Sequence, residues 1–174
     1  ILQNFKTRPG HMDQLHIDLW HKGMNILCDS GTYSYATDIG NKMALTSAHN
    51  TVMADNKEMK KKGPFLVYGW TYANNIEFSS NKFKGTMISK NGYSHTREIE
   101  KKDNSYIIKD TIGGSFKNIK ALFHTPCEIN KKEYGLDLIY NDTLFAKILT
   151  DGGIEISESY RSLYYMKKEK INQI

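Results

Sequence analysis

A residue period of two runs through most of this chain and limits the folds that are open to it. Short runs of apolar and β-branched residues are separated by Gly, Asn and Asp at intervals of about ten residues, the pattern of consecutive β-strands. No stretch has the period of about 3.6 residues that marks a long amphipathic helix. We therefore expect an all-β fold, a β-sandwich of two stacked antiparallel sheets. The expected strands are residues 15–20, 25–28, 51–54, 65–68, 75–78, 85–89, 96–100, 106–109, 120–124, 136–140, 144–149 and 154–157.

Turn chemistry between these segments favours the same fold. Gly, Asn and Asp tolerate a positive φ angle, which tight hairpins require. Such residues stand between the expected strands at 21–23, 90–92, 102–104, 141–142 and 151–153.

Length and composition indicate one domain that spans residues 1–174. A chain of 174 residues with 39% apolar residues can bury one ordinary core. Its mean hydropathy of −0.57 is that of a protein without a membrane span, and no apolar run reaches the length that a span needs. The chain begins with Ile1 and shows no leader pattern, so we expect it to be a piece of a longer chain.

The net charge of +5 comes from 24 basic and 19 acidic residues, several of which cluster at 57–62 and 166–170. A basic surface suits polyanions such as acidic polysaccharides. The alternative is a solvated loop at the first cluster and a frayed tail at the second. Neither cluster is interleaved with stacking aromatic residues, so a nucleic-acid partner is not expected.

The two cysteines, Cys28 and Cys127, form no CxxC pair, and each lies in or beside an apolar run. We expect two buried, reduced thiols.

Histidines and a carboxylate recur beside turn residues in the first third of the chain. His11 follows Pro9 and Gly10, Asp29 follows an apolar run, and His49 precedes Asn50. Imidazole and carboxylate groups suit zinc and similar divalent ions, and imidazole can also carry a proton near neutral pH. The plainer interpretation is an exposed loop histidine at His11 and a turn-capping carboxylate at Asp29.

Other polar and aromatic residues share expected strand faces. His16 could project toward one groove with Asp18 and Trp20, or lie on a polar outer face. His95 and Arg97 could bind a uronate carboxylate or sulfate, or form a polar pair between sheets. Tyr33 and Tyr35 could pack, or stack on a sugar ring. We expect His21 to lie on a surface turn. His124 is expected to have a structural role.

Several of these motifs together resemble a known family. Arg-Pro-Gly-His-x-Asp-Gln-Leu-His at 8–16, Asp-x-Gly-Thr-Tyr-x-Tyr at 29–35 and His-Asn-Thr-Val at 49–52 are similar to the C-terminal domain of heparinase II/III-like proteins. The segments at 93–99, 108–114 and 123–126 continue the resemblance, which covers roughly residues 8–165. That family contains polysaccharide lyases and their relatives.

The resemblance implies an α/α-toroid domain before a β-sandwich, with the glycan held in the cleft between them. Such lyases cleave beside a uronic acid by β-elimination, and the tyrosine acid/base comes from the helical half. It implies that His11 has a catalytic or metal-binding role, and that Asp29 and His49 are ligands of a divalent metal. Zinc is the first expectation for that metal, with calcium and manganese as alternatives. The isolated chain is then expected to be inactive, and a periplasmic or secreted location is expected, or a cytoplasmic one in a surface-polysaccharide cluster.

The chain departs from the family pattern at two places. The family often has a second histidine two positions before His11, where this chain has Pro9, so His16 could supply that imidazole. After Val52 the family tends to have Asp-Gly, whereas this chain has Met53 and Ala54.

Four residues are the expected substrate contacts: His16, Tyr33, Tyr35 and Arg97. The rival hypothesis is a non-catalytic carbohydrate-binding or structural β-sandwich of bacterial surface polysaccharide metabolism. In it, a set of aromatic residues forms a stacking surface: Trp20, Trp70, Tyr33 and Tyr72.

Overall fold

The computed structural model describes residues 10–35, 37–58, 61–62, 67–68, 72–89 and 92–174. Strands dominate it, and every ladder between its named strands is antiparallel. The all-β class and the sandwich of antiparallel sheets predicted from the sequence are confirmed. The expected strand segment at 65–66, Trp70, and Arg8 and Pro9 of the first motif lie outside the described residues.

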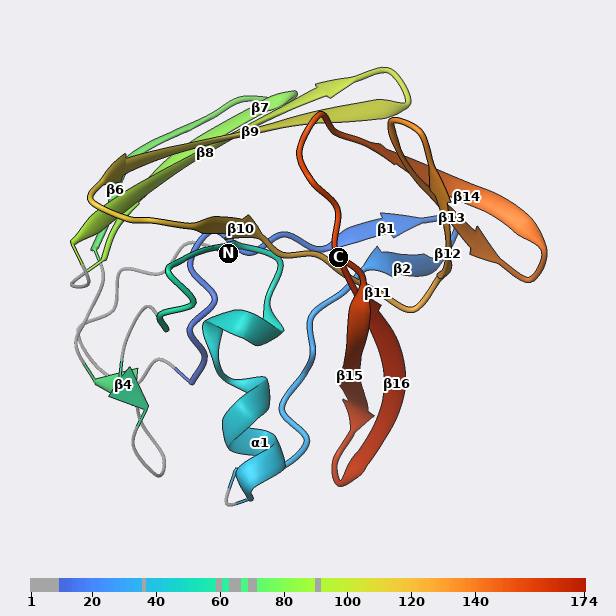
Figure 1. Ribbon diagram of the computed structural model, residues 1–174, viewed down its shortest axis with the longest axis horizontal. Coiled ribbons are helices and arrows are strands. Elements are labelled where there is room, and N and C mark those ends of the chain that lie inside the picture. The colour runs from blue at the N-terminus through green and yellow to red at the C-terminus, as the bar shows by residue number, and fades with distance from the viewer. Residues whose placement is uncertain (1–9, 36, 59–60, 63–66, 69–71, 90–91) are drawn as a thin grey trace.

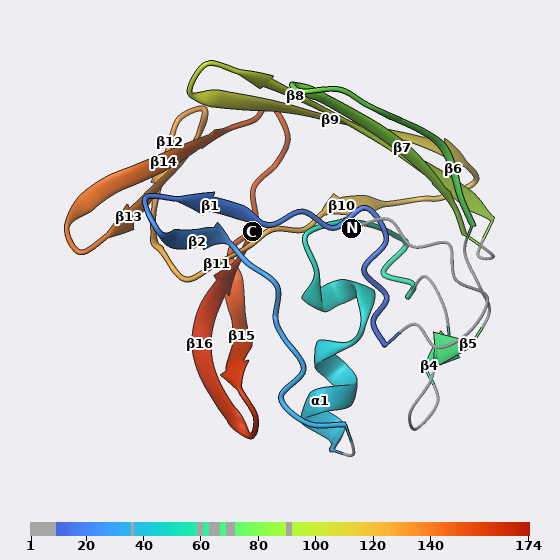
Figure 2. The ribbon, with the colours of Figure 1, turned by 180° about the vertical axis from the view of Figure 1, so that it is seen from behind.

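The largest sheet forms one layer, an arch that crosses the top of the molecule in both side views (Figures 1 and 2). Its neighbours follow chain order because each strand is joined to the next by a short turn, as in a meander. Along its third strand, burial alternates between buried and half-buried over the first six residues, and the buried positions are Tyr93, His95 and Arg97. The strands of this sheet are β6 (Tyr72–Phe78), β7 (Lys82–Ile88), β8 (Tyr93–Lys102) and β9 (Ser105–Gly114).

Shorter strands form the layer beneath the arch. β1 (Leu19–His21) pairs with β2 (Met24–Leu27), and β3 (Val52–Ala54) pairs with β10 (Ile119–Ala121). β11 (His124–Thr125) lies beside β2, where the Cys28 amide donates to the carbonyl of His124.

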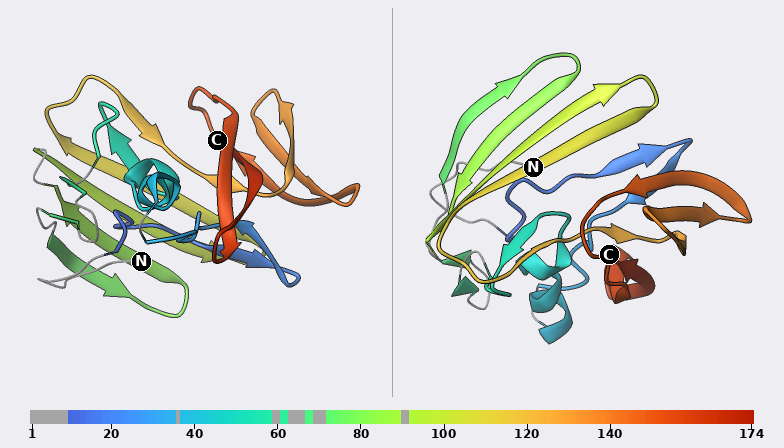
Figure 3. Two further views of the ribbon diagram at one scale, coloured as in Figure 1. Left: turned by 90° about the horizontal axis from the view of Figure 1, so that it is seen from below. Right: turned by 45° about the horizontal axis from the view of Figure 1, so that its top comes forward.

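Further strands and two short helices surround these layers. A three-stranded sheet flanks one end, and a long hairpin descends beside the first helix (Figures 1 and 3). The flanking sheet contains β12 (Glu128–Lys132), β13 (Gly135–Tyr140) and β14 (Thr143–Leu149). The hairpin is β15 (Ser157–Tyr164) and β16 (Lys167–Gln173), and the remaining elements are α1 (Asp38–Met43), the 3-10 helix η1 (Thr46–Ala48), β4 (Lys61–Lys62) and β5 (Val67–Tyr68).

Two apolar clusters make up the described core. The first lies between the arch and the layer beneath it, and the second lies between β2 and the flanking sheet. Their buried members are Leu15, Ala54, Met87 and Tyr93 in the first cluster, and Ile26, Leu27, Cys127 and Leu138 in the second. Cys28 and Cys127 are free and buried, as predicted, and burial raises the pKa of the Cys28 thiol to about 11.

A buried arginine links the two layers. Arg97 of β8 is fully buried and donates through Nε and Nη2 to the two carboxylate oxygens of Asp110 on β9, at 2.8 and 2.9 Å. Its Nη1 donates to the carbonyls of Leu15 and Asn50 in the lower layer, at 2.8 and 2.7 Å. Each of these hydrogen bonds is charge-assisted and therefore strong. Together they hold the segments around Leu15 and Asn50 beneath the arch.

Four sequence-based expectations about secondary structure were wrong. The strand expected at 120–124 is interrupted, because β10 ends at Ala121 and β11 begins at His124. The strand expected at 15–20 begins only at Leu19, because Leu15 has a φ of 61° that breaks the extended run. The strand expected at 154–157 starts at Ser157 and continues into the hairpin. The tail expected to fray at 166–170 belongs to β16, where Glu169 and Lys170 pair with Arg161 and Glu158 across the hairpin.

The hairpin turn expected at 21–23 is confirmed, with positive φ angles at Lys22 and Gly23. None of the helices in the described ranges is long and apolar enough to cross a membrane.

Candidate metal centre

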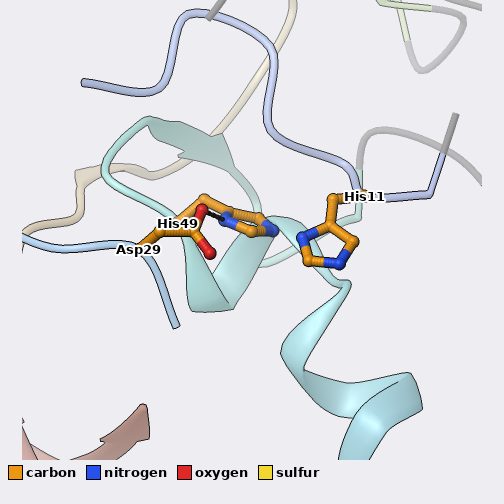
Figure 4. A group of neighbouring side chains, drawn as sticks. All are labelled: His11, Asp29 and His49. Carbon is orange, nitrogen blue, oxygen red and sulfur yellow. Dashed lines mark hydrogen bonds and ion pairs between the residues drawn. The ribbon is translucent and has the colours of Figure 1, made fainter. Parts of the chain in front are cut away.

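Three side chains from separate loops meet beneath the arch. His11, Asp29 and His49 each offer a ligand atom, and these atoms lie within 4.8 Å of one another. The ring centroids of His11 and His49 are 5.1 Å apart. Figure 4 shows the Asp29 carboxylate and the His11 ring on opposite sides of the His49 ring. The sequence-predicted trio therefore converges in space.

Short helices and backbone hydrogen bonds position the two histidines. Thr37 caps α1 by accepting the Gly40 amide, and the chain continues through η1 to His49. The Met12 amide donates to the carbonyl of Ala44 at 2.8 Å, which places His11 beside the end of α1.

Asp29 follows β2 and accepts hydrogen bonds on both carboxylate oxygens. Oδ1 accepts the Gly31 amide at 2.6 Å, and Oδ2 lies 2.9 Å from His49 Nδ1. Burial alone would raise the pKa of Asp29, but hydrogen bonding to His49 and the charges of His49 and His16 outweigh it and hold the pKa well below its usual range. Asp29 is therefore a carboxylate that stays ionised, and it caps its turn as well as facing the histidines.

His49 is completely buried, and its Nε2 has no hydrogen-bond partner among the described residues. A carboxylate on Nδ1 favours the tautomer with the proton on Nδ1 and the lone pair on Nε2, which is the form that binds a metal. Buried polar atoms without a partner are rare in folded proteins, and an ordered water or a bound ion is a common partner for them. The donor set of two imidazoles and one carboxylate thus fits a divalent ion of the zinc type.

His16 lies against the same group but is buried rather than projecting into a groove. Its ring centroid is 5.5 Å from that of His49, edge to face. The Asn50 amide donates to His16 Nδ1 at 2.8 Å, so the lone pair of Nδ1 is used and Nε2 carries the proton. That Nε2 lies 3.5 Å from Asp18 Oδ2 and 3.7 Å from Asp29 Oδ2. His16 therefore faces the carboxylates of the site.

Asn50, which follows His49, joins four segments. Its Nδ2 donates to the carbonyls of Ile17 and Cys28 at 2.8 and 3.1 Å, and its Oδ1 accepts the amide of His124 at 2.6 Å. Asn50 was not among the site residues predicted from the sequence. Its position directly after His49, in the His-Asn-Thr-Val motif, is the sequence feature that could have indicated this role.

Two carboxylates were not predicted as site residues, although one alternative placed Asp18 in a groove with His16. Asp18 holds the Asn25 side chain and the Asp29 amide through Oδ1, at 3.0 and 3.2 Å. Asp110 holds Arg97 and accepts from His95 Nε2 at 2.7 Å. Alternation alone did not separate Asp18 from surface residues, and Asp110 entered only as part of the family motif at 108–114.

The other expected substrate contacts are buried or lie outside the strands. Arg97 is fully buried within its hydrogen bonds to Asp110, Leu15 and Asn50, and this is the geometry of the polar pair between layers rather than of an exposed glycan contact. Tyr33 and Tyr35 are not on a strand, and Tyr33 has a φ of 57°. Their expected common strand face is therefore wrong.

Exposure differs among the remaining aromatic and histidine candidates. Tyr35 is 71% exposed and Trp20 is 64% exposed. His124 is buried against Asn50, and burial, followed by the charges of His49 and His16, lowers its pKa to about 4. His21 is exposed at the end of β1.

The fold is shared with solved lyases. The chain resembles a heparinase III described as the BT4657 gene product, with 22% identity and a TM-score of 0.71, over 94% of this chain and 27% of that one. It also resembles the heparan sulfate lyase HepC from Pedobacter heparinus, with 19% identity and a TM-score of 0.73, over the same shares. This chain thus spans about a quarter of the length of these enzymes.

No curated protein matches the chain. The family model described as "Heparinase II/III-like, C-terminal" matches residues 5–173, nearly the whole chain. The chain therefore belongs to the heparinase II/III-like family, in which it corresponds to the C-terminal domain.

Proposed function

We propose that this chain is the metal-binding β-sandwich of a polysaccharide lyase that acts on uronate-containing glycans, of the heparan or alginate type, by β-elimination. The observation that carries the proposal is the convergence of His11, Asp29 and His49, with the buried Nε2 of His49 left without a partner. The family membership supports the same class of activity.

His11 and His49 would hold the metal together with Asp29, which would bind it directly or support it through the Nδ1–H of His49. A bound divalent ion would supply positive charge that neutralises an acidic group or organises the site. The chain's own residues would orient that centre: Asp29 keeps the proton of His49 on Nδ1, and His16 directs its Nε2 toward Asp29. His11 is only half-buried, unlike His49, so it is the histidine of the trio with access to a ligand from solvent.

β-Elimination needs three functions at the uronate. Its carboxylate must be neutralised, a base must remove the C5 proton, and an acid must protonate the departing glycosidic oxygen. His11 could serve one proton transfer, and the remaining groups would come from a helical domain of the full-length protein. The 174-residue chain alone is then an incomplete enzyme, which requires that domain as its partner.

Elemental analysis of the purified 174-residue chain tests the metal part of the proposal. Inductively coupled plasma mass spectrometry should find close to one zinc, or a similar divalent ion, per wild-type chain. The ion should be lost in Asp29→Ala and His49→Ala, while Asp137→Ala, a carboxylate on the flanking sheet, should keep it. A metal-free wild type would refute the metal centre.

Lyase assays test the enzyme part. A full-length protein should form unsaturated product, seen by its ultraviolet absorbance, from heparan- or alginate-type polymers, and the isolated chain should not. Turnover by the isolated chain would contradict the claim that it is incomplete.

A second candidate function is a non-catalytic carbohydrate-binding sandwich of bacterial surface polysaccharide metabolism. The exposure of Trp20 and Tyr35 favours it, because an exposed aromatic face suits stacking on a sugar ring. Glycan binding by a full-length protein that forms no unsaturated product would support this candidate. A periplasmic or secreted location is proposed for either function, and localisation of a tagged full-length protein would test it.

A further inference from the structure

A groove of about 360 Å³ lies between the first helix and the β15–β16 hairpin. Ile39, Lys42 and Met43 of α1 line one side, and Tyr160 and Lys168 of the hairpin line the other. Figures 1 and 3 show the helix and the hairpin side by side. The volume lies within the range of small-ligand sites, roughly 300–1,000 Å³. No residue of the candidate metal centre lines this groove.

Hydrogen bonds fix the two sides of the groove relative to each other. Gln173 Nε2 of β16 donates to the carbonyl of Ser47 in η1 at 2.9 Å. The hydroxyl of Ser30 donates to the Met43 carbonyl at 3.0 Å, and the carbonyl of Ser30 accepts the Ser162 amide at 2.8 Å. The loop after Asp29 thus ties α1 to the hairpin, and a ligand would enter a largely pre-formed site.

The charge of the lining is positive. Lys42 and Lys168 lie on opposite sides, and the lining contains no Asp or Glu. Among the described residues neither lysine forms an ion pair. Glu158 on the same hairpin is paired with Lys170, and Lys168 contributes more weakly to the lowered pKa of Glu158. The Lys168 ammonium lies 4.2 Å from the centroid of the Tyr160 ring, which holds this charge at the groove.

The groove also has an apolar wall, formed by Ile39, Met43 and Ala48. An inorganic anion would use the two lysines but not this wall. A pyranose ring with a carboxylate would use both, because it has an apolar C–H face as well as a charged edge. Ala48 directly precedes His49, so the groove begins next to the candidate metal centre.

We infer that this groove is a second glycan site, which binds a uronate residue of an acidic polysaccharide through Lys42 and Lys168. The choice of a sugar over another amphiphilic anion rests on the proposed function. The site extends the glycan contact of this domain from the metal centre to the hairpin.

NMR titration of the ¹⁵N-labelled 174-residue chain tests the inference. Sodium glucuronate should cause saturable amide shifts at Lys42, Ser47, Tyr160 and Lys168, and glucose and sulfate should bind at least about tenfold more weakly. Cyclohexanecarboxylate matches the ring size and charge but lacks hydroxyls, and it should also bind more weakly. Equal or tighter binding of cyclohexanecarboxylate, or of sulfate, would overturn the assignment to a sugar. Absence of saturable shifts with glucuronate would overturn the site.

Matched lysine variants locate the binding. Lys42→Met and Lys168→Met should each weaken glucuronate binding about tenfold, which is about 1.4 kcal/mol. Lys147→Met removes an exposed lysine from β14, outside the groove, and should leave the affinity unchanged. An equal effect of all three substitutions would show attraction by net charge alone and refute the site. Spectra that otherwise match wild type show that each variant is folded.

One further variant separates this inference from the proposed metal centre. His49→Ala removes a proposed metal ligand, and the folded variant should still respond to glucuronate at Lys42 and Lys168. If the wild type binds a metal but shows no response in the groove, the inference fails and the metal centre stands. If the groove responds while the chain is metal-free, the metal centre fails and the groove stands.

Discussion

His49 Nδ1 lies 2.9 Å from Asp29 Oδ2, and this contact decides which nitrogen of the buried imidazole carries the proton. The ionised carboxylate accepts Nδ1–H, so the lone pair is on Nε2, the atom without a partner among the described residues. Asp29 can thus bind a metal directly, or favour metal binding by fixing the tautomer of His49.

Asp29→Asn is expected to reduce zinc affinity by at least about tenfold, and by up to about a hundredfold. The amide retains the size of the side chain and can still accept the Gly31 amide. Its NH₂ group would donate to His49 Nδ1, which moves the proton to Nε2 and blocks that ligand atom. Zinc titration against a competing chelator measures the effect. Asp137→Asn is the control, and equal affinities of Asp29→Asn and wild type would contradict the assigned tautomer.

Replacing the buried arginine tests whether its role is structural. Arg97→Met should lower the free energy of unfolding by about 3–5 kcal/mol, because the half-buried Asp110 would keep only His95 as a partner and the carbonyls of Leu15 and Asn50 would lose their donor. Arg97→Lys should not restore stability, since one ammonium cannot replace the paired bonds and reach two carbonyls. Urea denaturation measures both variants. A stable Arg97→Met chain that loses glycan binding would instead support the substrate role expected from the sequence.

His124 should make stability depend on pH. Its folded pKa of about 4 is below the ordinary value of 6.5, so protonation favours the unfolded chain. The contribution is fully present above pH 6.5 and is lost as pH falls from 6.5 to about 4, by at most about 3 kcal/mol. The free energy of unfolding of His124→Gln should fall less over this range than that of wild type. Parallel curves for the two proteins would contradict this assignment.

Gly31→Ala should destabilise the loop that joins α1 to the hairpin. Gly31 has a φ of +71°, and an added Cβ would lie 2.2 Å from the Ser162 carbonyl oxygen. Gly23→Ala is the matched control, because Gly23 has a φ of +79° but nothing within 4 Å of such a Cβ. The control should cost about 1–2 kcal/mol from the backbone angle alone, and Gly31→Ala should cost measurably more. Equal losses of unfolding free energy in the two variants would show that the hairpin can move away from the added Cβ at no cost.

Alternation predicted the strands that have one buried face. The expected segments at 96–100, 136–140 and 144–149 lie within β8, β13 and β14, whose pleated surfaces pack on the core clusters. The β15–β16 hairpin is exposed along most of its length, so its strands carry little apolar alternation and were missed. Leu15 is buried in the core but lies in a turn. Its apolar side chain therefore fitted the alternation of a strand that does not form at this position.

The sequence also indicated the trio of His11, Asp29 and His49, through its chemistry and the family resemblance. It left open whether Arg97 binds substrate or forms a polar pair between the sheets, because that choice depends on carbonyls supplied by distant turns at Leu15 and Asn50. Nor could it place His16 behind the carboxylates, since that depends on the bond from the Asn50 amide.

The side-chain bonds of Asn50 have a consequence for the cooperativity of the fold. They join Ile17, Cys28 and His124, and its carbonyl accepts from Arg97, so the backbone around His49 can open only when both layers separate. Amide hydrogens at 49–51 should therefore exchange with solvent only through global unfolding, whether or not a metal is bound. The segment that carries His49 would then belong to the most protected unit of the fold, although the three proposed ligands come from separate loops.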